Sequence, residues 1–298
     1  MTHFFKAHQQ SKKKLFFSVI CCLLSLCFLF GCESTGTRAG YLDENGLTEA
    51  PSSTQSSQPS KSQKKHVAVT FDDGPNYINT PTVLDALAQY GWKATFFVVG
   101  HRIVEGGGET LMRIAADGHE IGIHGYTHTN SESHYYDTCS DDIYAQEISM
   151  TVDTIRTYVP TYQPTLMRPI GGRISSERAA ASPYSIILWS IDTEDWKHKY
   201  YSGIPEAEAD ARVNTIVQNA LTGVQDGDII LLHDIYQSSA DATVKIFASL
   251  YEMGFDVVTV SELLGNSRQA GKIYSEGQPI LSWFACLPAD DRKRKIDA

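Results

Sequence analysis

The chain alternates between short apolar segments that are typical of β-strands and longer segments with helical periodicity. Seven strands are predicted, at Val67–Phe71, Thr95–Val99, Glu120–Ile123, Leu166–Arg168, Ile186–Ile191, Ile229–Leu232 and Val257–Val260. Helical patterns between them begin at Thr80-Pro81 and after Ser140, and end at Gly91, Gly223 and Gly254. Such an alternation favours parallel strands joined by right-handed crossovers. We therefore predict an α/β fold with a distorted (β/α) barrel of about seven parallel strands. A doubly wound open sheet is the alternative.

Size and charge limit the classes of protein that the chain can belong to. Its 298 residues are 42% hydrophobic, which is enough for one large domain with appendages. The formal net charge is −10, and no basic stripe follows the sequence. A nucleic-acid partner is therefore excluded.

The first 31 residues have the pattern of a secretory signal. Four lysines precede the apolar run Leu15–Phe30, and Gly31-Cys32 follows it. This apolar run of sixteen residues is shorter than the roughly 20 residues that span a bilayer. Because Leu29-Phe30-Gly31-Cys32 resembles a bacterial lipobox, we expect a signal peptide over 1–31 and lipidation of Cys32. The protein would then be extracytoplasmic and lipid-anchored to the bacterial cell membrane. An uncleaved anchor and plain secretion are the alternatives.

Three further regions follow the signal. Nineteen of the 33 residues from 33 to 65 are Ser, Thr, Gln, Pro or Gly, so we expect a disordered tether over 32–65. The strand and helix patterns place one globular domain over 66–264, and a C-terminal extension is expected over 265–298. Without the first 31 residues, which hold four lysines and no acidic residue, the net charge is −14. Such a surface would repel anionic polymers.

Cysteine usage excludes one kind of metal site. After Cys32 the chain has two cysteines, Cys139 and Cys286, and no CxxC pair. A thiolate zinc site is therefore excluded. A disulfide between the two cysteines and a pair of thiols both remain open.

Ionisable residues gather where the predicted strands end. Five strands end at or just before Asp72-Asp73, His124, Arg168, Asp192 and His233. Because the carboxyl ends of parallel barrel strands share one face, we expect these side chains to form one site.

Two histidines in this set are spaced for a metal. His124 and His128 lie four residues apart, and one carboxylate from Asp72-Asp73 would complete a three-ligand site. Adjacent residues of a strand point to opposite sides, so only one aspartate is expected to face the ion while the other acts as a base. Two histidines and a carboxylate also suit Fe(II), so an iron oxygenase is an alternative.

Five segments resemble the five motifs of the polysaccharide deacetylases, the NodB-like enzymes of carbohydrate esterase family 4. The segments are Thr70-Phe71-Asp72-Asp73-Gly74-Pro75, His124-Gly125-Tyr126-Thr127-His128, Arg168-Pro169-Ile170-Gly171, Asp192-Thr193-Glu194-Asp195-Trp196 and Leu231-Leu232-His233. The resemblance covers about residues 66–264 and implies the family's fold, a distorted (β/α) barrel called the NodB-homology domain.

The resemblance implies a metal site and its ligands. By position, Asp73, His124 and His128 would bind a divalent metal. In the family this is usually Zn²⁺, with Co²⁺, Ni²⁺ or Mn²⁺ as other choices.

The resemblance also implies catalytic roles. Asp72 would be the general base that takes a proton from the attacking water, and Arg168 would orient it. His233 would be the general acid that protonates the leaving amine, and Asp192 would hold it.

Four more residues are implied to contact substrate. Leu231 and Trp196 would wall the pocket for the acetyl methyl group, and the backbone N–H of Gly171 would help to stabilise the oxyanion. Tyr126 is a candidate to stack on a sugar ring.

Two positions depart from the family's pattern. Gly125 stands where the family usually has Ser or Thr, whose hydroxyl braces the histidine loop, and Thr127 is a candidate to replace that brace. Ile170-Gly171 replaces a Pro followed by an aromatic residue, which removes a ring from the groove wall.

The expected function is metal-dependent hydrolysis of N-acetyl groups from a cell-surface polysaccharide, N-acetylglucosamine of peptidoglycan above other glycans. The alternatives are an O-acetyl xylan esterase and a non-catalytic glycan-binding lipoprotein. The expected partners are a peptidoglycan or chitin-like polysaccharide and a membrane reached through the lipid anchor. The protein is expected to be a monomer.

Overall fold

Nine strands form one sheet within residues 64–200 and 203–276, which are the residues that the computed structural model describes. They are β1 (Lys65–Asp72), β2 (Thr95–Val98), β3 (Glu120–Ile123), β4 (Leu166–Met167), β5 (Ser185–Ile187), β6 (Ile191–Asp192), β7 (Ile229–His233), β8 (Phe255–Val258) and β9 (Ile273–Tyr274). The order is β6-β7-β1-β2-β3-β4-β5-β9, with β8 paired to the first half of β1. Every pairing between these strands is parallel.

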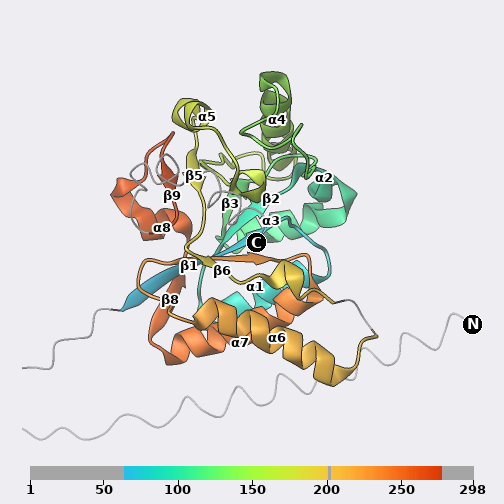
Figure 1. Ribbon diagram of the computed structural model, residues 1–298, viewed down its shortest axis with the longest axis vertical. Coiled ribbons are helices and arrows are strands. Elements are labelled where there is room, and N and C mark those ends of the chain that lie inside the picture. The colour runs from blue at the N-terminus through green and yellow to red at the C-terminus, as the bar shows by residue number, and fades with distance from the viewer. Residues whose placement is uncertain (1–63, 201–202, 277–298) are drawn as a thin grey trace, which may run out of the picture. The chain divides into compact units, whose positions relative to one another are not determined.

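The sheet curves into a barrel that does not close by a regular ladder. Its two end strands are β6 and β9, and an isolated bridge between Asp228, just before β7, and Glu276, just after β9, spans the gap. The predicted distorted (β/α) barrel is therefore confirmed, with nine strands in the described part rather than about seven (Figure 1).

The single strand predicted over 186–191 was wrong. The chain leaves β5 after Ile187 and rejoins the sheet at β6, beside β7 and at the other end of the strand order. The cause is a buried side chain: Arg168 donates from Nε to the carbonyl of Ile187 (3.1 Å) and from Nη2 to the carbonyl of Leu188 (2.9 Å). These carbonyls are satisfied by a guanidinium, so the ladder is interrupted there.

Helices and helical turns connect the strands. The α-helices are α1 (Asn79–Tyr90), α2 (Gly100–Arg102), α3 (Gly108–Ala116), α4 (Asp141–Tyr158), α5 (Ser176–Ala181), α6 (Glu206–Leu221), α7 (Gln237–Glu252) and α8 (Val260–Leu264). The turns are η2 (Ile103–Gly107), η3 (Ile170–Gly172), η4 (Asp195–Lys197) and η5 (Gly265–Ser267). As predicted, α1 ends at Gly91, whose φ of 67° is left-handed, and α4 follows Ser140, whose side chain caps it. The predicted start of the first helix was slightly wrong, because α1 begins at Asn79 rather than after Thr80.

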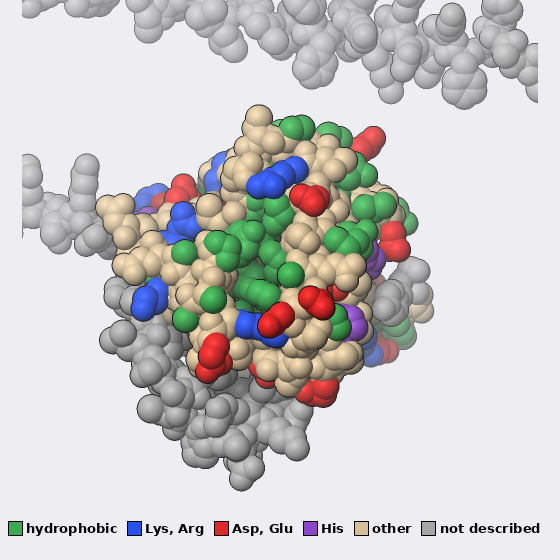
Figure 2. All heavy atoms as spheres, turned by 90° about the horizontal axis from the view of Figure 1, so that it is seen from above, with side chains coloured by type: hydrophobic (Ala, Val, Ile, Leu, Met, Phe, Trp, Pro, Cys, Tyr) green, Lys and Arg blue, Asp and Glu red, His purple; other side chains and the backbone are tan. Residues whose placement is uncertain are grey.

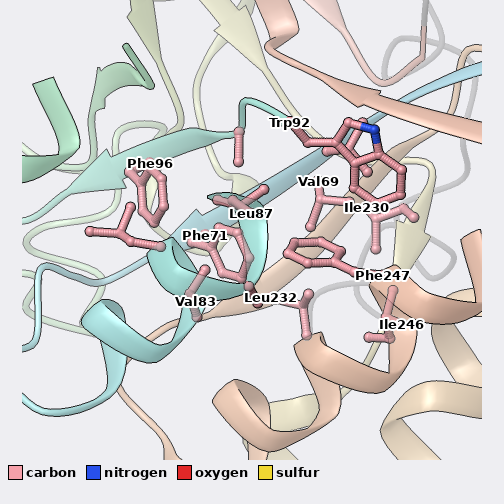
Figure 3. Packing of buried hydrophobic residues seen from close by; sticks show 14 of the residues in the cluster. Val69, Phe71, Val83, Leu87, Trp92, Phe96, Ile230, Leu232, Ile246 and Phe247 are labelled. Carbon is pink, nitrogen blue, oxygen red and sulfur yellow. The ribbon is translucent and has the colours of Figure 1, made fainter. Parts of the chain in front are cut away.

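Side chains alternate along β1 between two apolar layers. Val69 and Phe71 belong to the larger cluster, which lies between the sheet and α1 and α7, while Ala68 belongs to a second cluster of barrel residues that includes Phe97. Figure 3 shows the larger cluster, formed by Val69, Phe71, Ile230 and Leu232 of the sheet with Val83, Leu87, Trp92, Ile246 and Phe247. Because the side-chain period of a strand is two, Thr70 and Asp72 face the same way as Ala68.

The end of the molecule that carries α4 and α5 is mixed in character. Figure 2 shows hydrophobic side chains gathered in the middle of this face, with acidic and basic side chains around them. The face therefore does not present a field of a single sign.

Several predictions from the sequence concern residues outside the described part. The signal peptide over 1–31, Cys32, nearly all of the tether over 32–65, and Cys286 fall there. Within the expected extension over 265–298, β9 is an integral strand of the sheet. None of the helices within 64–200 and 203–276 has the length and apolar character needed to span a bilayer.

Candidate metal centre and active site

Two aspartates at the end of β1 lie against the same imidazole. The Oδ2 atom of Asp72 is 3.6 Å from Nε2 of His124, and Oδ1 of Asp73 is 3.5 Å from the same nitrogen. The expectation that adjacent aspartates diverge was wrong. Asp73 has left β1 and adopts a φ of 72°, a left-handed conformation that turns its carboxylate back toward that of Asp72.

The two histidines follow β3 in a tight loop. His128 has a φ of 51°, and its Nε2 lies 2.9 Å from Oδ1 of Asp73. The Nδ1 atom of His124 lies 2.8 Å from the carbonyl oxygen of Arg168, so it carries the proton and donates to that oxygen. This bond leaves Nε2 of His124 free to bind a metal, an arrangement that metal-binding histidines commonly adopt.

The donor set fits a divalent metal. One ligand atom each from Asp73, His124 and His128 lies within 4.8 Å of the others, and this is the one such cluster among the residues that the structure describes. Oδ1 of Asp73 is buried and receives no well-directed hydrogen bond. Buried polar atoms normally have a partner, so this oxygen is suited to coordinate a metal ion. Two imidazoles and a carboxylate with open positions are a common catalytic zinc set.

Arg168 holds Asp72 from inside the barrel. Its fully buried guanidinium donates from Nη1 to Oδ1 of Asp72 (2.7 Å) and to the hydroxyl of Thr70 (2.8 Å), and it lies over the ring of Phe97. Because Nε and Nη2 donate to the carbonyls of Ile187 and Leu188, each of the three guanidinium nitrogens has an acceptor. Asp72 is thereby held by Oδ1, and its Oδ2 is left to face His124.

His233 is held by Asp195, and the prediction that Asp192 holds it was wrong. Nδ1 of His233 lies 2.7 Å from Oδ1 of Asp195, and the backbone N–H of His233 donates to Oδ2 of the same residue (2.7 Å). Asp195 is fully buried and also accepts from Ser239 (2.5 Å). Burial by itself would lower the pKa of His233, but the charge and hydrogen bond of Asp195 outweigh it and raise the pKa to about 10.

Asp192 instead shapes the turn that brings Asp195 into place. Its Oδ1 accepts from the backbone N–H of Glu194 (2.8 Å), and Glu194 has a left-handed φ of 53°. Burial raises the pKa of Asp192. The signal that identifies Asp195 was present in the sequence, since it precedes Trp196 in the fourth motif, but the turn between the two aspartates was not foreseen.

The four expected substrate residues come from β7 and from three of the segments that follow strands. Leu231 is buried in β7, Trp196 is 37% exposed in η4, Gly171 lies in η3 with a φ of 60°, and Tyr126 is half-buried between the two histidines. The family usually has an aromatic residue at position 171, and the structure shows that another aromatic residue lies beside Gly171. A Cβ added to Gly171 would lie 3.4 Å from the ring of Tyr135, so an aromatic side chain from the loop after β3 lies beside this position.

Asp234 is another residue that sequence reasoning missed. It is fully buried and accepts from the hydroxyl of Thr80 (2.5 Å), and burial raises its pKa to about 7. A Cβ on Gly74 would come within 2.3 Å of its Oδ1, so the loop after Asp73 requires glycine at this position. Asp234 and Thr80 thereby support the loop that carries Asp73.

Comparisons with known proteins identify a family and several relatives of this chain. The family profile described as Polysaccharide deacetylase matches residues 60–183. The peptidoglycan-N-acetylmuramic acid deacetylase PdaC of Bacillus subtilis is 38% identical over 200 residues, which are 67% of this chain and 39% of that protein. A peptidoglycan-N-acetylglucosamine deacetylase of Bacillus cereus is 35% identical, over 67% of this chain and 89% of that protein. The match thus spans about two fifths of PdaC and nearly all of the second relative.

Solved structures share the fold. The structure of PdaC has a TM-score of 0.58 at 37% identity, over 67% of this chain and 89% of that one. A family 4 acetyl xylan esterase from Clostridium thermocellum, solved with a cobalt ion, has a TM-score of 0.59 at 29% identity, over 71% of this chain and 98% of that one.

Proposed function

Because the chain belongs to the polysaccharide deacetylase family, we propose that it hydrolyses N-acetyl groups of a cell-surface polysaccharide, N-acetylglucosamine of peptidoglycan, and releases acetate. The observation that carries this proposal is the placement of a base and an acid on neighbouring strands. Asp72 of β1 stands directly opposite His233 of β7 in the sheet register, and the donor set of Asp73, His124 and His128 lies beside them. The names of the relatives support the choice of peptidoglycan.

Amide hydrolysis requires an activated water, a stabilised oxyanion and a protonated leaving nitrogen. When bound, a divalent metal lowers the pKa of a coordinated water to about 7 and polarises the acyl carbonyl. Asp72, fixed by Arg168 through Oδ1, would accept the proton of the attacking water. His233 would donate its Nε2 proton to the leaving amine, because Asp195 fixes the proton on Nδ1 and keeps the ring cationic at neutral pH.

The same residues suit cleavage of an acetyl ester, which has a better leaving group than an amide. The similarity to the acetyl xylan esterase makes O-acetyl xylan the second candidate substrate. The non-catalytic alternative is disfavoured because both the carboxylate and the imidazole that the reaction needs are in place.

Acetate release tests the reaction and the substrate together. The chain would be stripped of metal with a chelator, reloaded with Zn²⁺ and offered peptidoglycan, chito-oligosaccharide and acetylated xylan in parallel. We expect release from peptidoglycan that chelation abolishes and zinc restores. Release from xylan alone would replace the amidase assignment with an esterase, and no release with zinc bound would favour a glycan-binding protein.

We also propose that the protein is lipid-anchored on the outer side of a bacterial membrane. The proposal rests on the lysines, the apolar run Leu15–Phe30 and Gly31-Cys32. In cells labelled with a palmitate analogue, the wild-type chain should carry the label and a Cys32→Ser variant should not. A label that persists in the variant would contradict lipidation at Cys32.

A further inference from the structure

The segment between the two metal-binding histidines is held on its carbonyl side by α2. The backbone N–H of Gly100 donates to the carbonyl of Gly125 (3.0 Å), and the N–H of His101 donates to the carbonyl of Tyr126 (3.0 Å). Nδ1 of His101 also lies 2.8 Å from the same Tyr126 carbonyl. The backbone N–H groups of the same segment still require hydrogen-bond acceptors.

A single carboxylate meets that need. Glu147 lies in the first half of α4 and is 4% exposed. Its Oε2 accepts from the backbone N–H groups of Tyr126 (2.6 Å) and Thr127 (2.9 Å), and its Oε1 accepts from the hydroxyl of Thr127 (2.6 Å). All three donors lie between His124 and His128.

The backbone of this segment is in a conformation that requires support. Gly125 has a φ of 84° and His128 a φ of 51°, and a non-glycine residue adopts the left-handed region only at a cost. A hydroxyl-bearing side chain has no room at position 125, because a Cβ there would lie 2.7 Å from Oη of Tyr136 and 3.0 Å from Oε2 of Glu147. The histidine loop is therefore held by the carboxylate of Glu147 in α4 rather than by a Ser or Thr hydroxyl at position 125.

We propose that Glu147 is a positioning residue that holds His124 and His128 in the geometry needed to bind the metal. The inference rests on the proposed metal-dependent function. A carboxylate suits the role because it only accepts hydrogen bonds, whereas a glutamine has one acceptor oxygen for the same three donors. The candidate brace named from the sequence, Thr127, acts here through Glu147 rather than alone.

The test is metal affinity, measured without turnover. The zinc dissociation constants of the full chain and its variants would be determined by competition with a chromophoric chelator. We expect Glu147→Gln to weaken zinc binding about 10-fold and Glu147→Ala about 100-fold, the range found when residues that orient metal ligands are removed. The absorption spectrum of the Co²⁺-loaded protein should change with Glu147→Gln, because a displaced imidazole alters the ligand field.

Glu120, on the strand that leads to His124, provides a matched control for Glu147. It opens β3, at the end away from His124, and it also accepts from three donors: the hydroxyl of Thr95, and the N–H and hydroxyl of Ser261. Glu120→Gln should lower thermal stability as Glu147→Gln does, yet leave zinc affinity and the Co²⁺ spectrum unchanged.

The outcomes separate this inference from the proposed function. The positioning role would be overturned if the wild-type chain binds zinc and Glu147→Gln binds it with the same affinity. It would also be overturned if Glu120→Gln loses as much zinc affinity as Glu147→Gln. Either result would leave the deacetylase proposal standing. Absence of zinc binding by the wild-type chain would overturn both. Because Glu147→Gln preserves size and most contacts, the test does not depend on whether Glu147→Ala folds.

Discussion

Replacing Asp72 with Asn is expected to lower kcat on acetylated glycan by about 10²–10⁴-fold, the range attributed to loss of a general base. The variant keeps an oxygen for the Nη1 donor of Arg168, so its side chain should stay in place. What it loses is the ability of Oδ2 to take up a proton beside His124. Zinc affinity should stay within a few-fold of wild type, because the three proposed ligand atoms belong to other residues.

A variant of the neighbouring residue, Asp73→Asn, distinguishes the role of metal ligand from the role of general base. Asp73→Asn should lower zinc affinity strongly, and excess zinc should recover part of its activity. Asp72→Asn should not respond to excess zinc. The measurement is steady-state acetate release across a zinc titration for both variants, and recovery of Asp72→Asn by metal would assign the two roles the other way round.

Replacing Asp195 with Asn is expected to lower activity about 10²-fold or more and to move the alkaline limb of the pH–rate profile to lower pH. Every contact described for Asp195 is with a donor, two from His233 and one each from Ser239 and Trp196. The amide group of Asn would place N–H against one pair of these donors. In either orientation His233 loses the negative charge that stabilises its proton, and Nδ1 also loses its acceptor when the amide nitrogen takes the place of Oδ1.

The sign of the pH shift follows from the charge. A general acid works while protonated, so activity should fall as pH rises through the pKa of His233, which Asp195 raises to about 10. Without the carboxylate, only the charges of Asp73 and Asp72 oppose the effect of burial, so the pKa of His233 is lower and the fall in activity should begin at lower pH. Asp192→Asn is the control, because its oxygen can still accept from Glu194. A shift in the Asp192 variant but not in the Asp195 variant would restore the role first predicted for Asp192.

Folding stability gives a second readout of the same pair. The raised pKa of His233 contributes stability that is fully present below pH 6.5, the unfolded value, and is lost as pH rises to about 10. The metal-free wild-type protein should therefore lose stability over this window more steeply than Asp195→Asn does. Denaturant unfolding at several pH values measures the difference, and parallel curves would argue against the ion pair.

Residues that stand where a strand ends were foreseen because strand periodicity is a local property of the sequence. Parallel strands of a barrel place their carboxyl ends on one rim, independently of the conformation of the connecting loops. The sequence could therefore group Asp72 and Asp73 with His124, Arg168 and His233, and the family resemblance then assigned Asp73, His124 and His128 as ligands. The barrel itself followed from the same alternation, although β9 and the division of 186–191 into β5 and β6 did not.

The contacts that depend on how loops and helices approach the rim were decided by the tertiary structure. Asp195 rather than Asp192 meets His233 because a left-handed Glu194 turns the chain between them, and Asp72 and Asp73 face the same imidazole because Asp73 is left-handed too. Glu147 reaches Tyr126 and Thr127 because α4 packs beside β3, a relation between segments about twenty residues apart. The sequence determined which chemical groups reach the rim, because strand periodicity is encoded locally. The fold determined which group holds which, because such pairings depend on backbone turns and on the packing of distant elements.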